Sequence, residues 1–161
     1  MGIHTEAEIT INRPRNEVFD FLARGERLPE YIDDFASVTH EESGEPARGH
    51  VYSYKMKRGV EGTFEWKEFE PYDKLAWSGP SVKQGPGSMR PVGHWQLSDE
   101  GSGTHVKLVM EPEPGGLFKL LAPLMKMQMS KGNVRALEKL KAKLESDAMA
   151  ASSGGGTTGT A

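Results

Sequence analysis

The feature that most constrains the fold is an apolar stripe near the C-terminal end of the chain, over residues 117–144. Its side chains recur close to every 3.6 residues, which is the period of one face of an α-helix. At 1.5 Å per residue, a helix over this segment is about 40 Å long. Pro123 lies inside it and should kink the helix or split off a first turn. The stripe consists of Leu117, Leu120, Leu121, Leu124, Met127, Val134, Leu137, Leu140 and Leu144.

The chain before this helix alternates apolar and polar side chains with a period of two, which predicts the β-sheet that the helix covers. Residues 3–12 alternate apolar and polar side chains, and Arg13-Pro14 ends that strand because proline cannot donate to a ladder. Turn residues, including a Gly- and Pro-rich loop over 80–88, separate the strands that follow. These six further strands are predicted at 36–40, 50–57, 60–69, 75–79, 93–97 and 104–111.

Two short helical segments are predicted after the first strand, at 15–23 and 28–34. The order of strand, two short helices, antiparallel strands and one long helix indicates an α+β domain over residues 1–146. One apolar face of the sheet must be covered, and only the C-terminal helix is long enough to cover it. We therefore expect a curved antiparallel sheet of about seven strands around that helix, with a cavity between them. Residues 147–161, rich in Gly, Ser, Thr and Ala, should form a disordered tail.

Composition excludes several classes of function. The chain has no cysteine, which removes disulfides and thiolate chemistry and favours a reducing, cytoplasmic location. The net charge of −3 argues against nucleic-acid binding. No signal peptide or membrane-spanning segment is expected. Residues 117–146 nevertheless carry seven Lys or Arg against two Glu, so that peripheral contact with an anionic membrane is an alternative to an ordinary solvated face.

Four short motifs, in this order, resemble the START-like or helix-grip (SRPBCC) superfamily, in its polyketide cyclase/dehydrase and lipid-transport branch. They are Ile-Thr-Ile-Asn-Arg-Pro at 9–14, Glu-Val-Phe-Asp-Phe-Leu at 17–22, Gly-Thr-His-Val at 103–106 and Leu-Glu-Lys-Leu-Lys-Ala-Lys-Leu-Glu at 137–145. The resemblance implies a helix-grip fold with a hydrophobic cavity between sheet and helix. It carries over no catalytic residue and no cofactor, because the family has no universal catalytic signature.

The expected cavity is lined by side chains with inward parity on the strands or on an apolar helical face. Large flat aromatic surfaces suit rings and acyl chains, although packing in an ordinary core is the alternative for each of them. Methionines near the start of the long helix should let the wall adapt to a ligand. The expected ligand-binding residues are Phe19, Leu22, Tyr52, Tyr54, Phe64, Trp66, Trp77, Trp95, Met110, Leu121 and Leu124.

Signatures of metal and hydrolytic enzymes are absent from the sequence. The segment His-Glu-Glu-Ser-Gly at 40–44 lacks the second histidine of HExxH, and no GxSxG occurs. The five histidines are scattered without metal-ligand spacing, so no metal site is expected. His50 is the best-placed candidate acid or base, but a lone histidine is more often structural.

Three functions remain open at this stage, and the oligomeric state is open as well. The first is a binding or carrier protein for a hydrophobic small molecule, which predicts an almost wholly apolar lining. The second is a polyketide cyclase or aromatase, which needs a polar group deep in the cavity. The third is a protein-interaction module, which predicts a filled cavity and a large exposed apolar patch.

Overall fold

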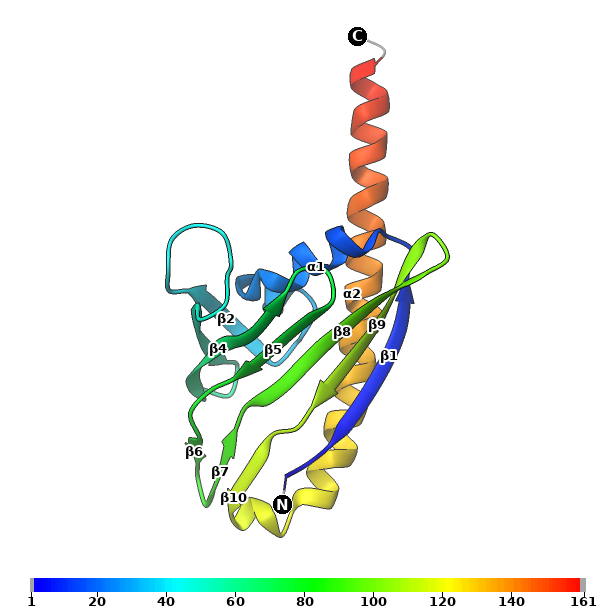
Figure 1. Cartoon of the computed structure of the whole chain (residues 1–161). Helices are drawn as coiled ribbons and strands as arrows, with labels where there is room; N and C mark the ends of the chain where they lie inside the picture. Colours follow the sequence, from blue (N-terminus) through cyan, green and yellow to red (C-terminus); the bar gives the residue numbers. More distant parts are fainter. Residues whose placement is uncertain (1, 160–161) are drawn as a thin grey trace.

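The computed structural model describes the backbone of residues 2–159 and the side chains of residues 2–147. A strongly curved antiparallel sheet of seven strands runs in the order β1-β9-β8-β5-β4-β3-β2, and the long helix α2 lies along its concave side (Figure 1). The expected α+β helix-grip architecture is confirmed. The seven strands are β1 (Thr5–Ile11), β2 (Phe35–His40), β3 (Val51–Met56), β4 (Glu61–Glu70), β5 (Lys74–Ser78), β8 (Val92–Glu100) and β9 (Gly103–Met110).

Two short helices connect β1 to β2, as the sequence predicts. The first, α1, spans Arg15–Ala23 and buries Val18, Phe19 and Leu22. The second, η1, is a 3-10 helix over Gly25–Glu30, so the predicted turn at 28–34 begins and ends too late. The predicted helical turn is of the tighter 3-10 type, and Pro29 lies within it.

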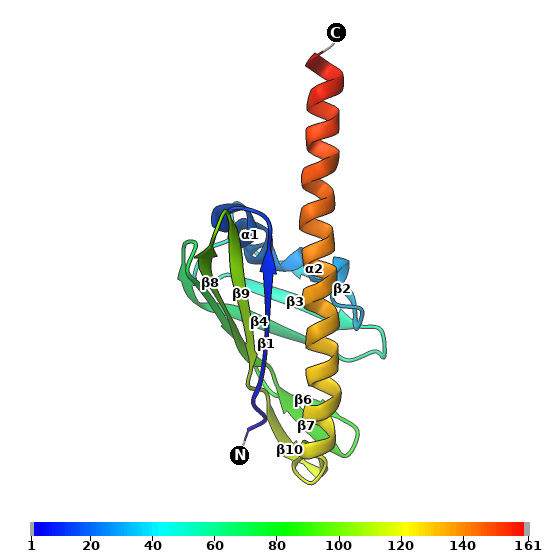
Figure 2. The same ribbon diagram turned by 90° about the vertical axis from the view of Figure 1, so that its right-hand side faces the viewer.

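A second, three-stranded sheet was not expected from the sequence. It consists of β6 (Val82–Gln84), β7 (Gly87–Arg90) and β10 (Glu113–Gly116), and it lies beside the beginning of α2 (Figure 2). The predicted loop over 80–88 is thus largely a hairpin, turned by Gly85 at a φ of 59° and by the proline that follows it. Pro114 is tolerated in β10 because β10 is an edge strand.

The long helix begins with the break that Pro123 predicts. A 3-10 turn, η2 (Leu117–Lys119), precedes α2 (Ala122–Gly159). The backbone of α2 runs through residues 147–159, part of the segment that we predicted to be disordered. Side chains beyond Asp147 lie outside the described residues, so the separation of this tail from the domain stays a prediction.

Among the described side chains of α2, the buried ones lie between residues 133 and 144. Leu137, Leu140 and Leu144 are buried against the sheet, and Asn133 donates a hydrogen bond of 2.9 Å to the hydroxyl of Thr5 on β1. Over residues 117–134, by contrast, the side chains of the apolar stripe are exposed. At 3.6 residues per turn, most of this exposed set lies on a different helical face from the buried set. The exposed members are Leu117, Leu120, Leu121, Leu124, Met127 and Val134.

Candidate functional site

Six of the expected ligand-binding residues form a packed aromatic and aliphatic core beneath α1. Their side chains are between 0% and 5% exposed, and each belongs to the main hydrophobic cluster. They come from α1, from the middle of β3 and β4, and from β8, where alternation turns every second side chain towards the concave face. The six are Phe19, Leu22, Tyr52, Phe64, Trp66 and Trp95.

Two polar side-chain atoms of this core are hydrogen-bonded within the fold. The Tyr52 hydroxyl and the Trp66 indole N–H both donate to the backbone carbonyl of Ala23 at the end of α1, each over 3.1 Å. The two bonds attach β3 and β4 to α1 and stabilise an otherwise unpaired helix-terminal carbonyl. Tyr52 and Trp66 therefore have a structural role in this conformation, and they offer no free polar atom to a ligand.

A second set of expected residues lies on the concave face but is only half-buried: Tyr54, Trp77 and Met110. Trp77 and Met110 both pair with Gly93 of β8 in the strand register. A Cβ at Gly93 would lie 2.3 Å from the Trp77 ring, so glycine is needed there for the indole to lie close to the sheet. Gly62 has the same relation to Tyr54, whose hydroxyl oxygen would lie 2.4 Å from an added Cβ. The sequence thus leaves apolar surface on the sheet that other side chains do not fully cover.

Of the last two expected residues, Leu121 directly precedes α2 and Leu124 lies on its first turn; they are 41% and 49% exposed. Met125 and Met129 follow them on α2 and are half-buried. The structure therefore divides the expected lining into a packed core and an uncovered apolar set. We use the term uncovered apolar set for Tyr54, Trp77, Met110, Leu121 and Leu124.

Tyr31 is the interior polar residue that sequence reasoning did not include in the site. Its side chain is 1% exposed, and its hydroxyl has no hydrogen-bond partner among the described residues. The ring lies 6.4 Å from the Trp95 ring, which in turn lies 6.3 Å from Trp77. Burial raises the pKa of the Tyr31 hydroxyl far above its ordinary range, so the phenol stays neutral. The short helical segment predicted at 28–34 points the Tyr31 ring inward, but the sequence does not reveal whether the hydroxyl finds a partner.

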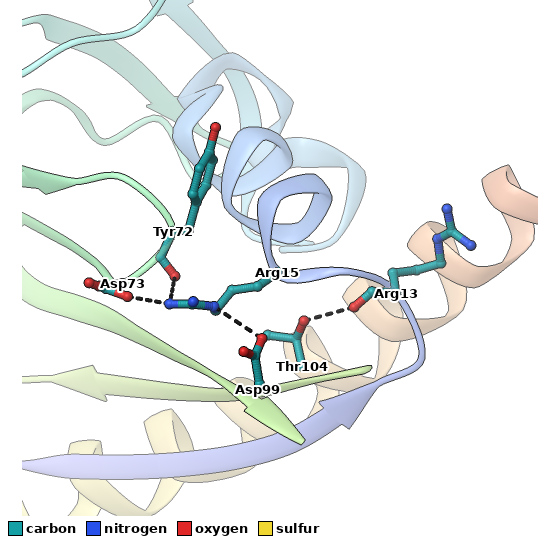
Figure 3. Close-up of polar contacts among 6 residues, drawn as sticks. All are labelled: Arg13, Arg15, Tyr72, Asp73, Asp99 and Thr104. Atoms are coloured by element: carbon teal, nitrogen blue, oxygen red, sulfur yellow. Dashed lines mark hydrogen bonds and ion pairs between the residues drawn. The ribbon is translucent and has the colours of Figure 1, made fainter. Parts of the chain in front are cut away.

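A hollow of about 420 Å³ opens on the surface at the start of α1, away from the uncovered apolar set. Figure 3 shows Arg15 at its edge, donating to the Tyr72 carbonyl at 3.2 Å and to the Asp73 and Asp99 carboxylates. Thr104 donates to the Arg13 carbonyl at 2.7 Å. Because two carboxylates neutralise the one guanidinium, this polar hollow is suited neither to an anion nor to an apolar ligand. The hydrogen bonds of Arg15 instead attach the start of α1 to the turn that follows β4 and to the end of β8.

A smaller hollow of about 330 Å³ lies beside the β6–β7 hairpin, and its lining includes Ser81, Lys83 and Ser88. Pro86, Gly87 and Gly116 complete its lining. Within the described part of the chain, no helix combines the length and the apolar character that crossing a bilayer requires.

The fold is similar to that of several solved structures. The protein TTHA0849 from Thermus thermophilus superposes with a TM-score of 0.73 at 21% identity, covering 89% of this chain and 98% of that one. The ZhuI aromatase/cyclase from a Streptomyces species gives 0.72 at 14% identity, covering 90% and 94%. A START superfamily protein from Mycobacterium smegmatis gives 0.69 at 8% identity, covering 90% and 99%.

Among curated protein sequences, none matches this chain. The family model described as polyketide cyclase/dehydrase and lipid transport matches residues 2–145, which is nearly the whole of the domain. This match covers more than half of the chain, so the chain belongs to the polyketide cyclase/dehydrase and lipid-transport family.

Proposed function

We propose that the protein binds a hydrophobic small molecule between the concave face of the sheet and the first turns of α2. The uncovered apolar set carries this proposal. Apolar surface left in water costs about 25 cal/mol per Å², and a ligand lying against these five residues would bury it. Ligand sites are typically lined by such apolar and aromatic side chains, with a few polar groups that fix orientation.

Tyr31 supplies the polar group in this proposal. A buried hydroxyl without a partner costs about 1–3 kcal/mol, and a ligand carbonyl or hydroxyl that reaches it would remove this cost. Trp95 lies between Tyr31 and Trp77, so the ligand must displace it or pass beside it. The half-buried methionines of α2 can repack during this step. The favoured ligand is therefore elongated and apolar with an oxygen at one end, such as a lipid, a quinone or a polyketide-like chain.

Titration with environment-sensitive fatty acyl, sterol and polyphenol probes tests the proposal. A ligand of drug-like size should bind with micromolar affinity or better, at about −0.3 kcal/mol per heavy atom. Leu124→Trp, which adds bulk beside the site, should weaken binding at least about ten-fold, or by about 1.4 kcal/mol. Val134→Trp is the matched control, because Val134 is equally exposed (50%) further along the same helix. Folded wild-type protein that binds none of the probes would contradict the proposal.

A second candidate function is cyclisation of a polyketide chain, which the similarity in fold to an aromatase/cyclase favours. Such a reaction can proceed largely by holding the chain in a folded conformation, because positioning alone supplies several kcal/mol of the barrier. Tyr31, as a neutral phenol, would donate a hydrogen bond to a reacting carbonyl. Turnover of a poly-β-keto thioester by the wild type, with loss of turnover in Tyr31→Phe, would establish this activity. Binding without turnover would contradict the cyclase activity and support the carrier function.

A third proposal is contact with an anionic membrane through the exposed start of α2. Between Glu113 and Glu138 the chain carries four basic residues and no acidic one, beside the six exposed apolar residues of the stripe. Apolar side chains with flanking cations are typical of helices that lie in a membrane interface. The protein should sediment with vesicles containing phosphatidylserine but not with phosphatidylcholine alone, and Lys126→Glu/Lys131→Glu should abolish this. Lys55→Glu, on β3, is the control. Equal sedimentation with both vesicle types would contradict a contact that depends on charge.

A further inference from the structure

His40, Glu42 and His50 meet at the end of the β2–β3 hairpin. His40 is the last residue of β2, and His50 directly precedes β3. One ligand atom from each of the three side chains lies within 4.8 Å of the other two. The sequence analysis found no metal-ligand spacing among the histidines, because ten residues separate these two along the chain. Antiparallel pairing of β2 with β3 brings them together.

The two imidazoles face each other through nitrogen atoms. His40 Nε2 lies 2.9 Å from His50 Nδ1, and 4.0 Å from the nearer carboxylate oxygen of Glu42. Zinc binds imidazole nitrogen at about 2.0–2.1 Å, which places two such nitrogens about 3–3.4 Å apart on one ion. A small opening of the pair therefore makes room for a metal ion. Without a metal, one proton must lie between the two nitrogens.

Contacts outside the three side chains already hold two of them in place. The His40 ring stacks on Tyr52 with a centroid distance of 4.6 Å and an interplanar angle of 11°, and its side chain is 11% exposed. The Glu42 carboxylate accepts a 2.8 Å hydrogen bond from the backbone N–H of Val51. Partners of this kind, which orient the ligands, are a general feature of protein metal sites.

The chemistry of the donors selects the class of ion. Two imidazoles and one carboxylate suit zinc and neighbouring divalent transition metals, whereas magnesium and calcium prefer sites made of oxygen atoms. The Glu42 side chain is 39% exposed, so solvent can reach the site and complete the coordination. We propose that His40, Glu42 and His50 bind one zinc-like divalent ion, which fastens the 41–50 loop to the edge of the sheet.

Calorimetric titration of the metal-free full chain with Zn²⁺ near neutral pH tests this site. We expect one ion to bind with micromolar affinity or tighter, to raise the melting temperature and, when Co²⁺ replaces Zn²⁺, to produce visible absorption bands. His50→Ala and Glu42→Gln should each weaken binding at least about ten-fold. These two variants keep the stacked ring of His40, so they should fold normally.

His105→Ala is the matched control. His105 lies within 2.8 Å of Glu8 and 3.3 Å of Glu100, so it also has two carboxylates but lacks a second histidine. Its variant should bind Zn²⁺ as the wild type does. If the wild type binds no ion at micromolar Zn²⁺, or if His50→Ala and Glu42→Gln bind it as tightly as the wild type, the proposed site is wrong. Ligand binding by the uncovered apolar set does not depend on this result.

Discussion

Replacing Tyr31 by phenylalanine removes a single oxygen atom from the interior, and we expect this change to stabilise the protein. The hydroxyl is buried without a partner among the described residues, so its removal recovers about 1–3 kcal/mol of desolvation cost. The void that it leaves, roughly 10 Å³, costs about 0.2 kcal/mol. A net gain of about 1–3 kcal/mol in the free energy of unfolding should result. For a chain of this size, each kcal/mol of that gain raises the melting temperature by about 2–4 °C.

Tyr52→Phe provides the matched comparison, because Tyr52 is equally buried but donates to the Ala23 carbonyl. Trp66 still donates to that carbonyl in the variant, so only one hydrogen bond is lost and the cost should be about 0.5–1.5 kcal/mol. Urea unfolding, followed by circular dichroism and by fluorescence, measures both changes if the m-values stay equal. A Tyr31→Phe variant that is destabilised by about 1 kcal/mol would refute the reasoning, since its hydroxyl must then have a partner in solution. The same variant should bind a ligand about ten-fold more weakly, although it is the more stable protein.

Three further predictions concern stability. Leu137→Ala should cost about 2–5 kcal/mol in urea unfolding, because Leu137 is buried under the sheet; a cost below about 0.5 kcal/mol would mean that α2 is not packed there. Hydrogen bonds from His4 and Lys107 lower the pKa of Glu6 from 4.5 to about 2, so the stability that this carboxylate contributes is complete above pH 4.5 and is lost as the pH falls towards 2. The free energy of unfolding should therefore decline less in Glu6→Gln than in the wild type as the pH falls from 4.5 towards 2. Parallel pH curves for the two proteins would contradict this prediction. Truncation after Ser146 should leave the melting temperature within about 2 °C; a fall of about ten degrees would place the tail on the body of the domain.

Alternation was sufficient to predict which strand residues turn inward. Trp66 and Trp95 are buried as expected, because every second side chain of a strand faces the same side of the sheet. The sequence analysis assigned Leu124 and Leu137 to one apolar stripe, yet the two lie on different faces of the helix and only Leu137 is covered by the sheet. Whether a side chain of α2 is buried depends on which part of the helix the sheet covers, and this is a property of the tertiary structure.

Polar detail was harder to predict, because it depends on individual atoms. The sequence does not indicate that Tyr52 finds the Ala23 carbonyl while the Tyr31 hydroxyl finds no partner among the described residues. It also does not indicate that His40 and His50 face each other, which follows from the register of one hairpin. Side-chain pairing across a sheet requires the strand register, and spacing along the chain does not supply it.

The most direct test of ligand binding uses tryptophan quenching by a brominated fatty acid, because bromine quenches an indole only at close contact. Trp77 is the half-buried indole beside the proposed site, whereas Trp66 and Trp95 are buried in the core. The wild type should show saturable quenching at micromolar ligand. Trp77→Phe should lose a large part of the quenching and still bind an acyl probe, because phenylalanine keeps an aromatic surface there; the remaining quenching should come from Trp95, which the ligand passes on its way to Tyr31. Quenching that does not saturate, or that is unchanged in Trp77→Phe, would contradict a ligand site between the sheet and the first turns of α2.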